Sequence, residues 1–413
     1  MRSIVFNFRA LAFYSLCAFW AALTFSNALT EITFVVSLVF WICYQLQRPS
    51  LILGPLPKSV WIPLAGFIIL CLFSLLWSEY PKQSVRGIFK WLQQIMVFFM
   101  VIDIFRDEKS LSRFEVVFFG VLVLAVANGF YQYFIGKDFL RGFERHASNA
   151  GFRISGSFKT YGQLGAYLIS TLPFLAALWR VPAQSKNVWW RSLLLGILLI
   201  AGLVVLFWTR SRGAFVAFGT GVIFFLFLKR KFIYLFLLML AIGGAFFVLP
   251  KGMIIHMDIH GKEQSLVERY YLWDRAIQVI RAKPWGGTGI NTYSAAHNKY
   301  DRTQNWRVRT YYAHNGYLQL AAETGLPSLF LFLFFLFQYF YQSLKKLKGI
   351  ESRDIRAASA GLLVGVFNFL VLCLVDTDLH NPQPVMIFWF LLGIAWSYQT
   401  VSDAPKLGLT QSV

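Results

Sequence analysis

Long apolar runs dominate this chain, and most of the polar connections between them are short. Each of twelve runs is near the length that a helix needs to cross a bilayer. They predict membrane spans near 11–25, 32–46, 60–77, 86–105, 114–134, 163–179, 192–209, 213–228, 232–249, 326–342, 357–375 and 384–398. The first run shows no small-residue cleavage site, so we interpret it as an anchor that is retained. The pattern predicts an all-α polytopic membrane protein with about 12 transmembrane helices.

One long polar stretch interrupts this pattern late in the chain. Residues 250–325 are polar over a length that no other connection reaches, and the stretch from 135 to 162 is intermediate. We therefore divide the chain into membrane helices 1–9 over 1–249, one large loop with amphipathic helices over 250–325, and membrane helices 10–12 with a cytoplasmic tail over 326–413. A carrier with alternating access usually has two halves of similar loop layout, and this chain shows no such symmetry.

Two helices are expected inside the large loop. Apolar residues recur at helical spacing over 265–282, and the glycine-rich stretch from Lys283 to Gly289 ends that helix. The apolar stripe consists of Leu266, Tyr270, Trp273, Ile277 and Ile280, and we interpret it as packing or membrane contact. His314 is expected to open a second, short helix that Gly325 ends.

Composition and charge agree with a membrane protein and set its orientation. Hydrophobic residues make up 57% of the chain and charged residues 14%, which is far from an average soluble domain. About half of the 39 Lys and Arg fall on short connections of one side, and the positive-inside rule makes that side cytoplasmic. Both termini are then cytoplasmic, and the large loop and all six histidines lie outside. We expect membrane lipids, and no nucleic acid, among the partners.

Several cationic residues run against this charge bias on the outer side. Arg210 and Arg212 occupy a very tight outer turn, and Arg86 and Lys90 lie one helical turn apart at the outer end of the fourth span. Contact with lipid phosphates is an alternative for Arg210. For Arg212 a functional role is favoured, because Gly213 and the alanine after it leave room for a ligand. Together these residues predict a pocket for an anionic group.

Arg269 is a further candidate, near the start of the first helix in the large loop. An arginine at the boundary between water and lipid can hold a phosphate with two hydrogen bonds.

No cofactor or metal is expected. The four cysteines lie inside apolar spans, and the chain has no phosphate-binding glycine loop of the ATPase type. The stretch Asp376-Thr-Asp378 resembles the metal site of nucleotide-sugar transferases, but it lies outside, where such sugars are absent, so we interpret it as a polar cap beside His380. His256, Asp258 and His260 would need a further well-spaced ligand to bind a metal.

Several of these stretches together resemble one known family. They are Arg212-Gly-Ala, Arg269 followed by Trp273, the Pro284…Gly287…Gly289 turn, Arg153-Ile-Ser-Gly-Ser-Phe and His314-Asn-Gly…Glu323-Thr-Gly-Leu-Pro. They are similar to stretches of the bacterial O-antigen ligase and polymerase superfamily. The resemblance implies a polytopic glycosyltransferase of GT-C-like architecture in the bacterial inner membrane. Such enzymes use an undecaprenyl-diphosphate-linked glycan at the periplasmic face, and the ligases transfer it to the lipid A-core of lipopolysaccharide.

The resemblance also implies roles for individual residues. Arg212 and Arg269 would hold the diphosphate, with Arg210, Arg86 and Lys90 completing the pocket. His314 would be the general base for the acceptor hydroxyl, in a metal-independent transfer that inverts the anomeric centre. In the first turn of a helix, the positive helix end would help to keep this imidazole neutral. Glu323 and Arg153 would support the site, and Glu323 is the alternative base.

Two alternatives to a ligase remain open. A polysaccharide polymerase uses the same donor and a second lipid-linked glycan as acceptor, and the sequence does not separate the two. A polysaccharide or lipid flippase belongs to a different class and would also have twelve spans and outer cations. It would be expected to place charges along a central cavity, whereas the middle positions of these spans carry almost none.

Overall fold

The computed structural model describes residues 7–47, 56–148, 151–179, 188–231, 233–234, 264–300 and 312–401. Its helices and strands are α1 (Phe8–Phe25), α2 (Asn27–Gln47), α3 (Lys58–Phe73), η1 (Ser74–Trp77), α4 (Pro81–Ile104), α5 (Glu108–Ile135), β1 (His146–Ser148), β2 (Gly151–Arg153), α6 (Tyr161–Trp179), α7 (Val188–Thr209), α8 (Arg212–Leu228), α11 (Gln264–Ala282), α12 (Tyr293–Ala296), η2 (His297–Tyr300), α13 (Gly316–Thr324), α14 (Leu326–Gly349), α15 (Arg353–Leu372) and α16 (Pro382–Val401).

The described residues confirm an all-α polytopic membrane protein. Ten helices are long and apolar enough to cross a membrane: α1, α2, α3 with η1, α4, α5, α6, α7, α14, α15 and α16. Each coincides with a predicted span, and an eleventh, α8, is apolar but shorter. The remaining predicted span, 232–249, lies outside the described residues apart from 233–234.

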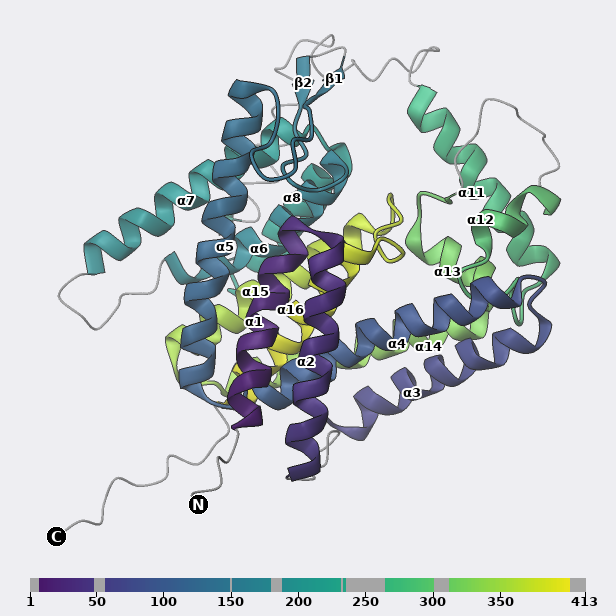
Figure 1. Ribbon diagram of the computed structural model, residues 1–413, viewed down its shortest axis with the longest axis horizontal. Helices are drawn as coiled ribbons and strands as arrows, with labels where there is room; N and C mark the ends of the chain where they lie inside the picture. Colours follow the sequence, from purple (N-terminus) through teal and green to yellow (C-terminus); the bar gives the residue numbers. More distant parts are fainter. Residues whose placement is uncertain are drawn as a thin grey trace, which may run out of the picture.

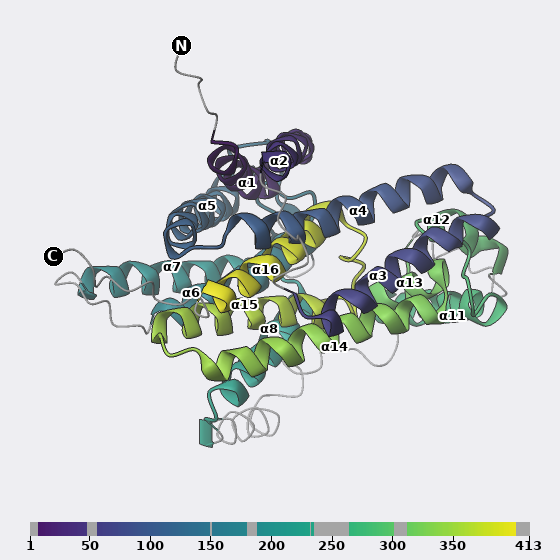
Figure 2. The same ribbon diagram turned by 90° about the horizontal axis from the view of Figure 1, so that it is seen from below.

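Helix α16 forms the centre of the bundle (Figure 2). It packs against α15, α4, α6 and α1. A helix that is apolar on all sides is suited to such a place, because every face then has an apolar neighbour. Trp389 and Trp396 of α16 are fully buried, and Phe98 of α4 meets the Trp389 ring with 5.9 Å between the ring centroids. Helices α3, α4 and α14 run side by side away from this centre (Figure 1).

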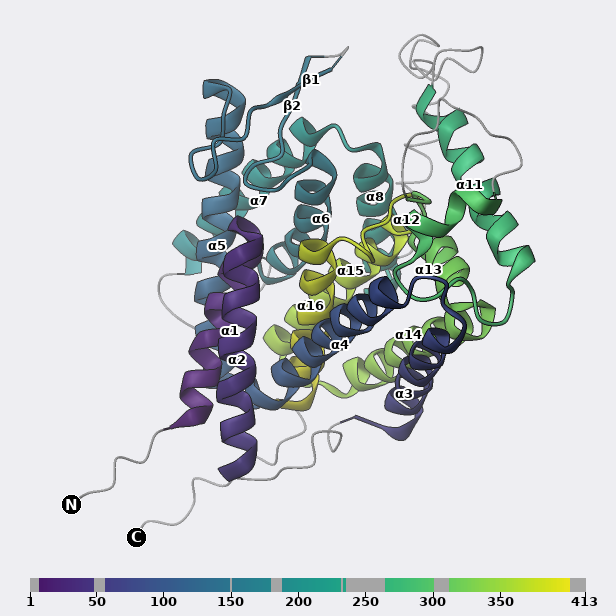
Figure 3. The ribbon, with the colours of Figure 1, turned by 45° about the vertical axis from the view of Figure 1, so that its right-hand side comes forward.

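The polar segments gather at one end of the bundle, which we name the loop face. It comprises the described parts of 136–160, 210–211, 264–325 and 373–381. Figure 3 shows the β1–β2 hairpin and α11 at this end. Contacts join the segments, since the Gly316 N–H donates to the carbonyls of Cys373 (2.8 Å) and Asp376 (2.9 Å). The other ends of the same helices form the opposite face.

Buried amides of α5 build the hairpin part of the loop face. Gln132 accepts from the backbone N–H groups of Ser155 (2.8 Å) and Gly156 (2.7 Å) through its Oε1 atom. The Ile154 N–H donates to the Trp208 carbonyl at the end of α7 (3.3 Å). The antiparallel strands pair His146 with Arg153. These contacts satisfy backbone groups that burial would otherwise leave unpaired, and they fix the position of Arg153.

Candidate active site

His314 is held where α13 meets the end of α15. Asn315 caps α13, since its Oδ1 atom accepts from the N–H groups of Tyr317 (3.1 Å) and Leu318 (3.0 Å), and its Nδ2 atom donates to the Leu374 carbonyl (2.9 Å). The helix therefore begins at Gly316, and His314 precedes it. The expectation that His314 opens the helix was wrong. His314 therefore does not lie in the first turn of α13, where the positive helix end was expected to act on it. His314 has a left-handed backbone, with φ of 46°.

The His314 ring faces a carboxylate. Its Nδ1 atom lies 3.7 Å from Asp376 Oδ1, a separation too long for a hydrogen bond, and the side chain is 33% exposed. Nδ1 itself is shielded from solvent. Trp273 of α11 donates its indole N–H to the His314 carbonyl (3.3 Å). Asp376 thus lies beside the imidazole and Trp273 holds the His314 backbone, while part of the ring remains open.

Asp376 also lies beside the start of α6. A Cβ atom added at Gly162, the second residue of that helix, would lie 3.6 Å from Asp376 Oδ2. The Asp376 carboxylate therefore lies beside the positive end of α6. The predicted role of Asp376 as a polar cap misses its contact with His314.

The first turn of α8 sits between α6 and the Asp376 segment. A Cβ atom at Gly165 of α6 would meet Ala214 Cβ at 3.1 Å, and one at Gly213 would meet Val375 at 3.1 Å. Ser211 caps α8, and Arg212 is its first residue and exposed. Two helix N-termini therefore lie next to each other and next to Asp376, with Arg212 at their edge.

Two more arginines lie near these helix starts. The Arg153 guanidinium lies over the ring of Tyr161, the first residue of α6, 4.7 Å from its centroid. Its Nε atom is buried without a hydrogen-bond partner among the described residues. Arg210 has a left-handed backbone (φ 52°), and its Nη2 atom would lie 3.1 Å from a Cβ at Gly151 of β2. Arg153 and Arg212 thus lie at the starts of α6 and α8, and Arg210 lies against the hairpin.

Arg269 approaches from α11. Residues four apart share a helix face, so Arg269 lies one turn from Trp273, which contacts His314. The predicted helix over 265–282 is confirmed, but its buried face is offset from the predicted apolar stripe, and Tyr270 is 69% exposed. Among the side chains of α11 that the structure describes, the buried ones are Leu272, Arg275, Ala276 and Val279. Sequence reasoning missed Arg275, because a charged residue is not expected to face a protein core.

Arg86 and Lys90 lie further away. Both are on the exposed face of α4, whose start packs on the large loop, since a Cβ at Gly87 would lie 2.5 Å from Asn291 Cβ. Asn291 Nδ2 also donates to the Gln83 carbonyl of this helix (3.3 Å), and no hydrogen bond among the described residues joins the start of α4 to the His314 segment. The structure therefore does not bring this pair together with His314.

Glu323 at the end of α13 is buried and supports the loop. Its carboxylate accepts from the backbone N–H groups of Asn291 (2.7 Å) and Tyr293 (3.2 Å). It also lies 3.5 Å from His380 Nε2. A Cβ at Gly287, where φ is 65°, would come within 2.3 Å of the Glu323 backbone, so only glycine permits this approach. Sequence reasoning missed the contact between Glu323 and His380; their placement on outer loops was the one available signal.

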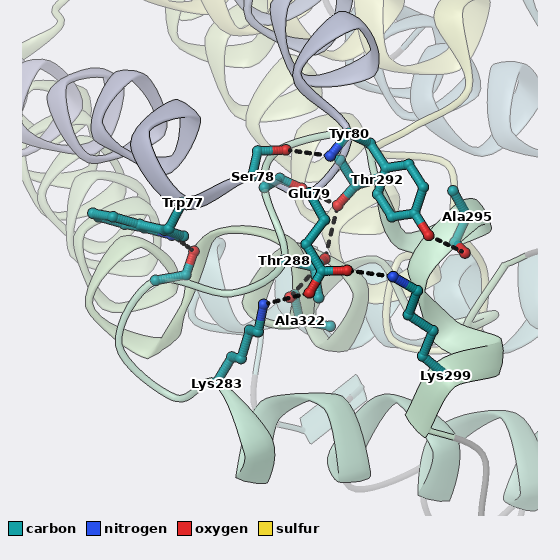
Figure 4. A network of polar contacts seen from close by, with 12 residues as sticks. Trp77, Ser78, Glu79, Tyr80, Lys283, Thr288, Thr292, Ala295, Lys299 and Ala322 are labelled. Carbon is teal, nitrogen blue, oxygen red and sulfur yellow. Dashed lines mark hydrogen bonds and ion pairs between the residues drawn. The ribbon is translucent and has the colours of Figure 1, made fainter.

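A cluster of polar contacts ties the large loop to the connection between α3 and α4 (Figure 4). Glu79 accepts from Lys283 (3.0 Å) and Lys299 (2.5 Å), and Trp77 donates to the Gly286 carbonyl (2.9 Å). The contacts with Lys299 and then Lys283 lower the pKa of Glu79. We name these five residues the loop clamp, because they hold both ends of the stretch 283–299 that follows α11.

Asp378 is buried behind Asp376. Its Oδ1 atom accepts from Asn381 Nδ2 (2.8 Å). Burial, and after it the neighbouring Asp376, raises the pKa of Asp378 well above the ordinary value. His256, Asp258 and His260, which were not expected to bind a metal without a further ligand, lie outside the described residues.

Comparisons with known proteins agree with the sequence resemblance. Residues 197–333 match the family described as O-antigen ligase. The chain is similar to the exopolysaccharide production protein ExoQ of Rhizobium meliloti, with 24% identity over 86% of this chain and 80% of that protein. It is also similar to a protein of Rickettsia conorii that carries a provisional polysaccharide ligase name, with 24% identity over 81% of this chain and 79% of that protein.

Proposed function

We propose that this chain, which belongs to the O-antigen ligase superfamily, transfers a glycan from undecaprenyl diphosphate to the lipid A-core of lipopolysaccharide. The observation that carries this proposal is that His314 and Asp376 lie beside the N-termini of α6 and α8, where Arg153 and Arg212 also lie. A proton acceptor next to an anion-binding site is what transfer from a diphosphate requires.

The donor diphosphate would bind at the starts of α6 and α8. Backbone N–H groups at a helix start and the positive helix end together favour an anion. Arg212 at this edge and Arg269 on α11 would hold the phosphates from two sides, and Arg153 and Arg210 would add charge from the hairpin. Arg86 and Lys90 on α4 would meet a more distant part of the donor.

His314 would act as the base. With its Nδ1–H turned toward Asp376, the Nε2 atom is left to take the proton of the acceptor hydroxyl. The 3.7 Å separation would shorten when substrate binds, as catalytic contacts often do. The acceptor oxygen then bonds to the anomeric carbon, the bond from that carbon to the diphosphate breaks, and undecaprenyl diphosphate leaves. Direct attack inverts the anomeric centre, and the arginines balance the leaving charge without a metal.

The active site would face the periplasm from the bacterial inner membrane. This proposal rests on the basic residues of the short connections at the opposite face. The loop face would then meet donor and acceptor glycans on the side where both are exposed.

The name of one relative suggests a second candidate, because it refers to exopolysaccharide production and names no ligase. The exopolysaccharide production protein ExoQ covers 86% of this chain. A polymerase of this class would use the same donor site and base, and it would accept a second lipid-linked glycan in place of lipid A-core.

One reconstituted assay separates these functions. Purified protein in liposomes receives polyprenyl-diphosphate glycan with either lipid A-core or more donor, in EDTA and without an energy source. We expect a covalent product with lipid A-core. A product with donor alone indicates the polymerase, and transport without a new bond indicates a flippase and contradicts the proposal.

A further inference from the structure

The opposite face holds a cavity of about 750 Å³ that the proposed reaction does not use. It opens between the ends of α6 and α8 and the start of α15, at the far end of the same helices whose other ends form the candidate active site. Trp179, Leu199 and Phe225 supply an apolar wall. Its size and this wall are suited to part of a lipid-sized ligand.

The remaining lining of the cavity is cationic. Lys229, Lys231, Arg353 and Arg356 line it, and no Asp or Glu is among its described lining residues. Arg356 donates to the Glu351 carbonyl (3.1 Å), and the Lys229 ammonium lies 5.6 Å from the centroid of the Phe225 ring. Neither contact supplies a negative charge. Like charges gathered around one cavity repel unless an anion joins them.

The charge of Lys229 is already disfavoured by this arrangement. Burial, and after it Arg356, lowers the pKa of Lys229. The positive-inside rule explains why basic residues occur at this face, but it does not require them to surround one cavity. Lys345 and Lys348 at the end of α14 show the difference, since they are basic residues of the same face and neither lines the cavity.

We propose that this cavity binds the phosphate headgroup of an anionic glycerophospholipid from the membrane leaflet at the opposite face. Lys229 and Arg356 meet the phosphate, Lys231 and Arg353 lie at the entrance, and Trp179 and Phe225 contact the upper part of the acyl chains. The basic residues match the phosphate of such a lipid, and the apolar wall matches its acyl chains. A free anion would use the basic residues only.

Native mass spectrometry of the purified chain tests this proposal. The protein is titrated in micelles with phosphatidylglycerol, phosphatidylcholine or inorganic phosphate as the probe. We expect a retained phosphatidylglycerol adduct and no comparable phosphatidylcholine adduct. In the Lys229→Gln/Arg356→Gln variant the half-saturating lipid concentration should rise roughly 10- to 30-fold, as expected for two lost lipid-facing cations.

The matched control is Lys345→Gln/Lys348→Gln, which removes the same charge from the same face and should bind as the unaltered chain does. If the first variant does not fold, Lys231→Gln/Arg353→Gln replaces it, because both side chains line the same cavity. Equal weakening in control and cavity variants would overturn the proposal in favour of general surface charge. Equal adducts of both lipids, or binding of inorganic phosphate alone, would also overturn it.

Discussion

The backbone of His314 is in a strained, left-handed conformation, which neighbouring contacts must stabilise. A residue other than glycine in the left-handed region costs on the order of 1 kcal/mol or more, and such positions are common at active sites. Here the Asn315 cap, the Gly316 contacts with the end of α15 and the Trp273 indole fix the residues on either side. With this backbone conformation the imidazole faces Asp376.

Replacement of His314 by Gln tests the base directly. Gln keeps hydrogen-bonding capacity but cannot take the proton. We expect transfer to fall by roughly 100- to 10,000-fold, the usual contribution of a general base. Donor binding should persist, because the arginines are intact. The measurement is product formation in the reconstituted assay, with donor binding measured separately. Transfer at the rate of the unaltered chain would leave His314 a structural role.

Arg212 and Arg269 are expected to act through planar, two-bond contacts with the diphosphate. Arg212→Ala and Arg269→Ala should each reduce transfer severely, and the Lys variants should recover little of it, because an ammonium is a point charge. Arg281→Ala on α11 is a control, since that residue is exposed at the far end of the helix. Near-normal activity of both Ala variants at matched expression would remove these arginines from the site.

Asp378 makes a prediction about pH. Because burial raises its pKa, the folded protein keeps this proton to a higher pH than the unfolded chain does. Its contribution to stability is therefore complete below the unfolded pKa of about 4 and is lost as pH rises toward the raised folded value. Asp378→Asn removes the titration and can still accept from Asn381. Between pH 5 and pH 8, the thermal midpoint of this variant should rise relative to that of the unaltered chain. A difference between the two midpoints that does not change with pH would contradict a raised pKa of Asp378.

At the scale of elements, apolar runs predicted the spans well and the contacts between elements poorly. A run of bilayer length is enough to place a span, so the helices α1 to α7 and α14 to α16 match their predictions. The start of α13 was misplaced by two residues, because Asn315 is the better cap and His314 stands before it. The pair of His314 and Asp376 joins two loops separated by two spans, and no spacing rule reports such a contact.

The large loop depends on the loop clamp for its position. Glu79→Gln should loosen residues 283–299, because one neutral side chain replaces the carboxylate that holds both Lys283 and Lys299. We expect faster amide hydrogen exchange in that stretch and little change in α16. Since the two lysines lower the pKa of Glu79, the clamp is complete above the unfolded pKa of about 4.3 and is lost as pH falls through the lowered value.

Lys58→Gln at the start of α3 is a suitable control, as it removes a charge elsewhere on the same pair of helices. Hydrogen exchange in 283–299 that does not differ between Glu79→Gln and this control would show that the backbone contacts of Trp77 and Tyr80 hold the loop without the ion pairs.

At the scale of the whole molecule, the two proposed sites occupy opposite ends of α6, α8 and α15. The starts of α6 and α8 and the end of α15 surround Asp376, while their other ends surround the cationic cavity. A glycan donor at the first site and an anionic lipid at the second would then meet the same three helices from different leaflets. This arrangement makes the membrane orientation of the chain the assumption that both proposals share.

A cysteine accessibility experiment tests that orientation. Asn298 lies on the loop face and is exposed, and Lys345 is exposed at the opposite face. Because the charge bias places the loop face in the periplasm, Asn298→Cys should react with a membrane-impermeant maleimide in intact spheroplasts. Lys345→Cys should react only after the membrane is broken. The native cysteines are buried or half-buried, which keeps the background low. The reverse labelling pattern would place the His314 site in the cytoplasm, where the proposed acceptor glycan is not displayed.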